Sequence, residues 1–225
     1  MIDALNEIIA KRSRWGFWKC FKVLRRSHRW NHKRVYRVYC ELHLNQKRRA
    51  KKRLPQRIKH PLAVPPQPNQ TWSADFMSDS LYAGKRFRTF NVIDDFNREA
   101  IGMEVDFSLP SERVIRELKQ IISWRGKPQV IRCDNGPEYI SGAIQNWAAE
   151  WGIRLEYIQP GNPQQNAYVE RFNRTVRYEW LSQYYWHDLA EVQDFATKWM
   201  WSYNHDRPNM ALGGFTPKQR LAMAA

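Results

Sequence analysis

The stretch NPQQNAYVERFNRTVRYEW, residues 162–180, has the pattern of an amphipathic helix. Its apolar residues recur at helical spacing and form one face, made of Val169, Phe172, Val176 and Trp180. Glu170 lies at the edge of that face, close in sequence to three arginines. Such a carboxylate either belongs to a ladder of surface ion pairs or is held there for chemistry. Which of these two interpretations of Glu170 applies depends on the rest of the sequence.

The segments before this helix alternate between strand and helix patterns. We expect three strands over residues 71–79, 85–97 and 98–107, with a turn at Asn97–Arg98 between the last two. A helix over 110–126 with Ser111 as N-cap, a strand over 128–136, a helix over 140–154, a strand over 155–159 and a final helix over 188–203 complete the pattern. This order predicts an α/β fold of the ribonuclease-H-like class, a mixed five-stranded sheet flanked by helices, although periodicity alone permits other mixed α/β sheets.

The charge of the chain is concentrated at one end. The 225 residues carry a formal net charge of +15. Residues 1–60 hold 19 Lys and Arg against 3 Asp and Glu, whereas the remainder holds 18 against 19. This excess indicates a polyanionic partner, and nucleic acid is favoured over a membrane surface because no apolar run is long enough to span a bilayer. The prolines of PLAVPPQPNQ predict a linker. We therefore expect a basic helical module over 1–60, a linker over 61–71 and a main domain over 72–225.

Within the basic module, two short helices are predicted, with Asn31 as the N-cap of the second. Two basic helices with a tight connection are typical of a helix-turn-helix-like DNA-binding unit; the alternative is a helical hairpin whose charges are merely solvated. The basic tail after the second helix is interpreted as a strap that follows DNA phosphates. The predicted DNA contacts of this module are Lys33, Arg34, Arg37, Arg48, Arg49, Lys51, Lys52 and Arg53.

The cysteines do not predict a disulfide framework or a zinc site. Cys20, Cys40 and Cys133 are odd in number and far apart, which is typical of a protein of the reducing cytoplasm. Together with nearby histidines, Cys20 and Cys40 offer the residue types of a zinc site without its spacing. Cys20 is expected to be a small buried thiol instead.

Two further carboxylates lie in the strand regions. Asp75 lies inside the first strand, and Asp134 ends the fourth, directly before an Asn–Gly turn. Taken alone, each of them is better explained by structure than by catalysis. We assign Asp94, Asp95 and Glu138 to structure as well.

Taken together, the three carboxylates match an ordered set of motifs. The stretches WSADF, RCDNGPEY and NPQQNAYVERFNRTVR resemble the three catalytic blocks of the DDE transposase and retroviral integrase superfamily, with 35 residues between Asp134 and Glu170. A basic residue seven positions after the glutamate, Arg177, also fits. YNHDRPNMALGGFTP and the N-terminal helices resemble the orfB-type transposases of bacterial insertion sequences, the insertion-sequence-three family.

The resemblance implies an integrase catalytic core in which Asp75, Asp134 and Glu170 are the catalytic residues and hold Mg²⁺ or Mn²⁺, as two ions. It implies DNA cleavage and strand transfer at the ends of an insertion sequence by a homo-oligomer assembled on terminal repeats and target DNA. A bacterial cytoplasmic, nucleoid-associated protein and an upstream-frame partner or fusion protein are implied as well. Asn173, Arg174 and Arg177 would approach the DNA backbone, although a solvated helix face explains Arg174 equally well. A catalytically inactive DNA-binding regulator and a cleavage-only nuclease remain the alternatives.

Overall fold

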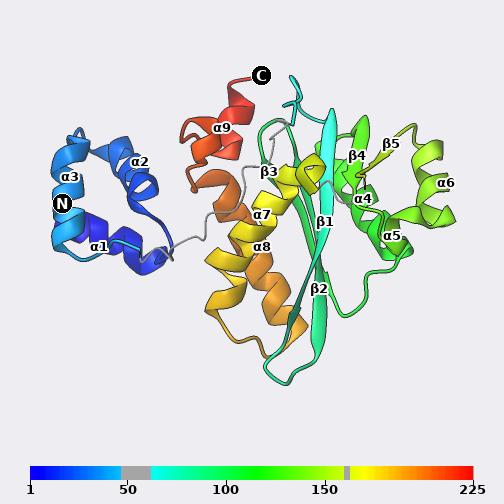
Figure 1. Ribbon diagram of the computed structural model, residues 1–225, viewed down its shortest axis with the longest axis horizontal. Coiled ribbons are helices and arrows are strands. Elements are labelled where there is room, and N and C mark those ends of the chain that lie inside the picture. The colour runs from blue at the N-terminus through cyan, green and yellow to red at the C-terminus, as the bar shows by residue number, and fades with distance from the viewer. Residues whose placement is uncertain (47–61, 160–162, 225) are drawn as a thin grey trace. The chain divides into compact units, whose positions relative to one another are not determined.

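The computed structural model describes residues 1–46, 62–159 and 163–224, and the chain divides into two compact units (Figure 1). The smaller unit combines Met1–Ile58 with Asp206–Thr216, and the larger combines Lys59–His205 with Pro217–Ala225. The segment Asp206–Thr216, which includes the short turn η3 (Met210–Leu212), thus groups with the smaller unit, whereas the predicted boundaries assign it to the main domain. Across the described ranges, none of the helices has the length and apolar character needed to cross a bilayer.

The smaller unit contains a helix that the sequence pattern did not predict. Its helices are α1 (Ile2–Lys11), α2 (Phe17–Ser27) and α3 (His32–Glu41). The two predicted helices correspond to α2 and α3, and the predicted cap is confirmed, because the Asn31 side chain accepts a hydrogen bond of 3.0 Å from the Lys33 N–H. The missed helix, α1, supplies the buried Leu5 to a core shared by all three helices. Cys20 is fully buried in the same core, as expected.

The larger unit is built on one mixed sheet, and its predicted class is confirmed. The strands are β1 (Thr71–Ser80), β2 (Arg86–Asp94), β3 (Glu99–Asp106), β4 (Val130–Cys133) and β5 (Arg154–Tyr157). They are arranged in the order β3-β2-β1-β4-β5. The first three form antiparallel pairs, whereas β4 lies parallel to both β1 and β5.

Helices cover both faces of this sheet (Figure 1). They are α4 (Ser111–Arg125), α5 (Pro137–Ile140), α6 (Gly142–Glu150), α7 (Ala167–Glu179), α8 (Leu189–His205) and α9 (Pro217–Ala222), with 3₁₀ turns η1 (Pro163–Asn166) and η2 (Leu181–Gln183).

Two details of the predicted helices are wrong. The helix expected over 140–154 is divided at Ser141, which has extended backbone angles, and stops at Glu150. The N-cap of α4 is Pro110, whereas the Ser111 hydroxyl donates to the Glu138 carbonyl at 2.9 Å.

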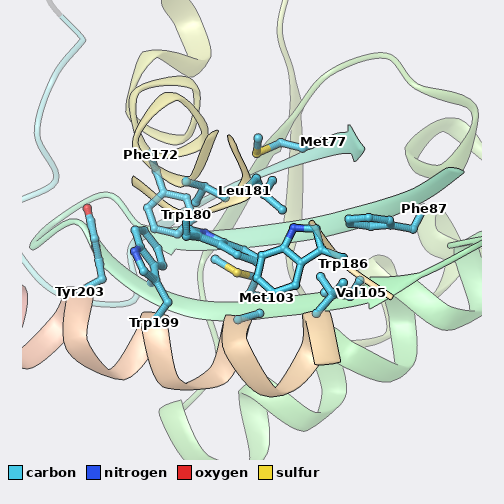
Figure 2. Close-up of a cluster of buried hydrophobic side chains, with 14 of the residues drawn as sticks. Met77, Phe87, Met103, Val105, Phe172, Trp180, Leu181, Trp186, Trp199 and Tyr203 are labelled. Carbon is cyan, nitrogen blue, oxygen red and sulfur yellow. The ribbon is translucent and has the colours of Figure 1, made fainter. Parts of the chain in front are cut away.

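Alternate residues of β1 and β2 face opposite layers, so the sheet separates two apolar clusters. On one side, Trp72, Phe90 and Val92 pack with residues of α4 and α6. On the other side, side chains from the sheet meet those of α7 and α8 around Trp180, as Figure 2 shows. The predicted apolar stripe is thereby confirmed: Val169, Phe172 and Val176 are buried on α7, and Trp180 is buried directly after its last residue.

The outer edge of the sheet is covered by side chains of α8. β3 is an edge strand, so its backbone lacks a neighbouring strand on one side. The Asn204 side chain accepts from the Ala100 N–H at 2.9 Å and donates to the Ala100 carbonyl at 2.8 Å. Gln193 does the same further along, with 2.8 Å to the Val105 N–H and 3.1 Å to the Met103 carbonyl. Two amide side chains therefore take the place of a sixth strand and satisfy the buried backbone groups.

Candidate active site

Asp75 lies in the middle of β1 and points toward α7. It stands directly opposite Asn91 on β2, and Met77, two residues along β1, packs in the cluster beneath α7. The Asp75 carboxylate accepts two hydrogen bonds of 2.8 Å, one on Oδ1 from the Phe76 N–H and one on Oδ2 from the Asn173 side chain of α7. Both of its oxygens are therefore held in a defined orientation.

Asp134 is brought beside Asp75 by the parallel pairing of β1 with β4. The register places Ser73 opposite Arg132; Asp75 lies two residues further along β1, and Asp134 lies two residues after Arg132, directly past the end of β4. The loop after β4 turns back on Asp134, whose Oδ1 accepts from the Gly136 N–H at 3.0 Å. A Cβ at position 136 would lie 2.9 Å from this Asp134 oxygen, so glycine leaves room for the carboxylate.

Glu170 reaches the same region from the first turn of α7. Its neighbours Val169 and Asn173 are buried, and Glu170 itself is half-buried at the edge of the helix's apolar face. Burial raises the pKa of its carboxyl, against a smaller opposing effect of the Arg174 charge. A carboxylate with a raised pKa at a helix edge does not have the environment of an ordinary surface ion pair.

The three carboxylates share one electrostatic environment. The pKa of Asp75 is raised to about 6, chiefly by burial and then by the negative charges of Asp134 and Glu170, while its hydrogen bonds from Phe76 and Asn173 act in the opposite direction. In the described parts of the chain, however, no three acidic, histidine or cysteine side chains are grouped tightly enough to hold a metal ion. The charges of Asp134 and Glu170 act on Asp75, so the three predicted residues lie in one region, but they do not form a closed set of ligands.

The residues predicted to contact DNA differ in how much of their side chain is free. Arg174 is exposed on α7. Arg177 instead binds β1, donating to Asp79 and to the Ser78 carbonyl, each at 2.6 Å. Asn173 is buried, and both ends of its amide are used within the protein, which the sequence pattern did not reveal. In the smaller unit Lys33, Arg34 and Arg37 are exposed on α3. Five other predicted contacts, Arg48, Arg49, Lys51, Lys52 and Arg53, lie outside the described residues.

The acidic residues assigned to structure have structural partners. Asp94 accepts from the backbone N–H groups of Asn69 and Phe96, both at 2.9 Å. Asp95 is fully buried and pairs with Arg132 at 2.8 Å. Glu138 of α5 binds the Arg88 guanidinium of β2. Each therefore joins separate elements of the fold.

Asn91 is the residue of this site that sequence reasoning missed. It is fully buried, and its side chain donates to the Asn173 Oδ1 at 2.8 Å. The available signal was a polar residue in the inward-facing series of β2, which reads Phe87, Thr89, Asn91, Ile93. The partner across the sheet could not be read from that pattern, because the pattern does not specify the register of β1 against β2.

Models of known protein families match both the smaller and the larger unit. An integrase core domain matches residues 65–163, a second integrase core domain model matches residues 151–217, and an HTH-like domain matches residues 2–53. The chain is 37% identical over 220 residues to the 31.7 kDa protein of insertion element IS407 from Burkholderia multivorans, covering 97% of this chain and 79% of that protein. It is also 37% identical to the 39.2 kDa protein of insertion element IS476 from Xanthomonas euvesicatoria, but it spans only 63% of that relative.

The fold has solved counterparts among retroviral integrases. The catalytic core domain of HTLV-2 integrase, determined in complex with magnesium in a trimeric form, superposes with a TM-score of 0.55 at 23% identity and covers 68% of this chain and 96% of that one. The order of domains, the relatives from insertion elements and the sheet with its covering helices agree with one another. The chain belongs to the orfB-type transposases of bacterial insertion sequences, in which an HTH-like domain precedes an integrase core.

Proposed function

We propose that this transposase cleaves DNA at the ends of an insertion sequence and transfers the freed strand to a target, using divalent metal ions held by Asp75, Asp134 and Glu170. The observation that carries the proposal is the convergence of the three carboxylates from β1, the end of β4 and the first turn of α7. The negative charges of Asp134 and Glu170 both act on Asp75. Three spaced carboxylates of this kind have no use in a protein that only binds DNA.

The residues fit hard divalent cations. Mg²⁺ and Mn²⁺ prefer oxygen ligands, and the three side chains offer only carboxylate oxygens. Carboxyl groups with raised pKa values gain when a nearby cation favours their charged form. The magnesium complex of the HTLV-2 integrase core, which shares this fold, supports the same choice of metal. Bound metal ions would activate the attacking oxygen and stabilise the leaving oxygen of the phosphodiester.

Each protein group then has a separate role. Asn173 and the Phe76 N–H orient the Asp75 carboxylate, and the Gly136 N–H orients that of Asp134. Arg174, exposed one turn after Glu170, is placed to contact a DNA phosphate beside the carboxylates. Arg177 acts indirectly, because its ion pair with Asp79 ties α7 to β1 and so holds the two catalytic elements together.

We assign DNA binding to the smaller unit as well as to the larger one. Lys33, Arg34 and Arg37 project from α3 into solvent and carry three of the positive charges in the basic region. Their charge supports phosphate contacts, which position a protein on DNA without reading its sequence. Joining two ends requires more than one copy of the chain, so we also propose a homo-oligomer on DNA, which an upstream-frame partner or fusion protein would extend.

The test compares the native chain with Glu170→Gln on labelled duplexes that carry the ends of the encoding element, in Mg²⁺ or Mn²⁺. Glu117→Gln is a matched control, since Glu117 is also a half-buried glutamate with a pKa raised by burial, but lies on α4. We expect nicking and strand joining by the native chain and by Glu117→Gln, and neither reaction by Glu170→Gln. Equal activity of all three proteins would exclude Glu170 from catalysis. DNA binding in EDTA, unchanged in all three, checks that the variants are folded.

A further inference from the structure

Asn91 is a buried amide in a position where core packing alone would favour an apolar side chain. The residues of β2 that face α7 are Phe87, Thr89, Asn91 and Ile93, and all four are fully buried. The Asn91 side chain donates to Asn173, but its own Oδ1 has no hydrogen-bond partner among the described residues. A half-satisfied amide in a core is unfavourable. The Thr89 hydroxyl on the same face is unpaired among the described residues as well, so what distinguishes Asn91 is its hydrogen bond to Asn173.

The hydrogen bonds around Asn91 determine how the next amide is oriented. The Asn91 Nδ2 donates to the Asn173 Oδ1 at 2.8 Å, and the Asn173 Nδ2 donates to the Asp75 Oδ2 at 2.8 Å. An asparagine amide has one accepting end and one donating end. Because Asn91 occupies the accepting end of Asn173, the donating end is directed at the carboxylate. The reverse orientation would place the Asn173 oxygen against the carboxylate and repel it.

The backbone places Asn91 and Asp75 beside each other, and Asn173 from α7 bonds to both of them. The two residues are directly opposite in the antiparallel pairing of β1 with β2, with their side chains on the same face of the sheet. Asn173 reaches this face from α7 among the apolar residues Val169, Phe172 and Val176. The three polar side chains therefore form a chain of hydrogen bonds enclosed by an apolar layer, where such bonds are strong and well oriented.

We propose that Asn91 is a positioning residue for Asp75, acting through Asn173, and that it holds the Asp75 carboxylate in the orientation that receives a divalent cation. This inference rests on the proposed function, since it assumes that Asp75 is a metal ligand. Groups that orient a ligand without touching the metal commonly change metal affinity when they are removed. We infer that metal affinity depends in the same way on Asn91, which lies two hydrogen bonds away from the Asp75 carboxylate.

The experiment is a double-mutant cycle on the affinity of the full chain for Mn²⁺, measured without DNA by titration calorimetry. The variants are Asn91→Leu, Asn173→Leu and the double variant, with Asp75→Asn as the reference for loss of a ligand. We expect Asn91→Leu to weaken Mn²⁺ binding by on the order of tenfold. The double variant should bind no more weakly than Asn173→Leu, because Asn91 acts only through Asn173.

Two controls separate positioning from general damage to the core. Asn204→Leu removes another buried asparagine, far along α8, and should leave Mn²⁺ affinity unchanged. Asn91→Ala removes the donor without adding a charge, so it should weaken Mn²⁺ binding about as much as Asn91→Leu and serves in its place if the leucine variant does not fold.

Native affinity in Asn91→Leu or Asn91→Ala, or losses that add in the double variant, would overturn the positioning role. Failure of the proposed function has a different signature, in which the native chain does not bind Mn²⁺ or Asp75→Asn binds it as well as the native chain does.

Discussion

Replacing Asp75 by asparagine should stabilise the metal-free protein at neutral pH, although it removes a proposed catalytic group. Burial and the charges of Asp134 and Glu170 raise the pKa of Asp75 to about 6. At pH 7.5 the native fold therefore keeps a negative charge where it is unfavourable. Functional residues often carry such a cost in stability, and a neutral side chain of the same shape relieves it.

The magnitude follows from the two pKa values. A carboxyl whose pKa is 3.8 in the unfolded chain and about 6 in the folded chain destabilises the fold by roughly 3 kcal/mol once it is ionised in both states. Asparagine has one side-chain oxygen instead of two, so it loses one of the hydrogen bonds from Phe76 and Asn173, at about 1 kcal/mol. The net gain expected for Asp75→Asn is about 2 kcal/mol.

The sign of the pH dependence of stability follows from the direction in which folding shifts the pKa of Asp75, which is upward. The folded state binds the proton more tightly than the unfolded state, so the penalty is absent below about pH 4, grows as the pH rises toward 6 and is complete above it. The advantage of Asp75→Asn should follow the same course. Below pH 4 only the lost hydrogen bond remains, and the variant should be slightly less stable than the native chain.

The assay is urea unfolding in EDTA at pH 7.5 and pH 4, with hydrogen exchange of peptides from β1 to localise the effect to the larger unit. Asp79→Asn is the control on the same strand, because Asp79 is paired with Arg177 and its replacement should not stabilise the protein. A stability of Asp75→Asn equal to or below that of the native chain at pH 7.5 would refute the reasoning, as would a gain that persists unchanged at pH 4.

Three further outcomes are expected. Asn204→Ala should lower the free energy of unfolding by about 2–3 kcal/mol and speed hydrogen exchange in β3, because the buried N–H and carbonyl of Ala100 lose their partner; unchanged exchange there would contradict the edge-covering role. Asn31→Ala should cost about 1 kcal/mol through loss of the α3 cap, seen as a lower helix content or melting temperature of the smaller unit. Glu117→Gln should stabilise the protein at pH 8 but not at pH 4.5, since burial and the charge of Glu104 raise the pKa of Glu117 to about 7. Equal differences in the free energy of unfolding between variant and native chain at both pH values, measured by urea titration, would contradict this prediction.

Much of the fold follows from local sequence patterns. The order of strands and helices along the chain and the helix around Glu170 were predicted because alternation and helical spacing are visible in one continuous segment. Helix α1 was missed although Leu5, Ile8 and Ile9 lie at helical spacing, so the local signal was present there. The division of the 140–154 helix at Ser141 had no such signal, since the Ser141 hydroxyl donates to Ser111 at 2.7 Å, a partner 30 residues earlier in the chain.

Partners that are distant in the sequence were also missed for individual side chains of the candidate active site. Asp75, Asp134 and Glu170 were found as spaced motifs, whereas the side chains that orient them were either missed or given another role. Asn173 and Arg177 were predicted to contact DNA, yet their side chains bind Asp75 and Asp79 of β1. These partners lie 98 residues away in the sequence and meet only when α7 packs on the sheet.

The sequence by itself determined most of the helices and strands, where the charge is concentrated and which three carboxylates are spaced as in an integrase core. These properties depend on residue type and on short-range spacing, which the chain carries before it folds. Only the tertiary structure decided that Asn91 stands opposite Asp75, that Asn173 joins them and that α8 covers the edge of β3. Those contacts depend on strand register and helix packing, because both bring together groups whose separation along the chain carries no local signal.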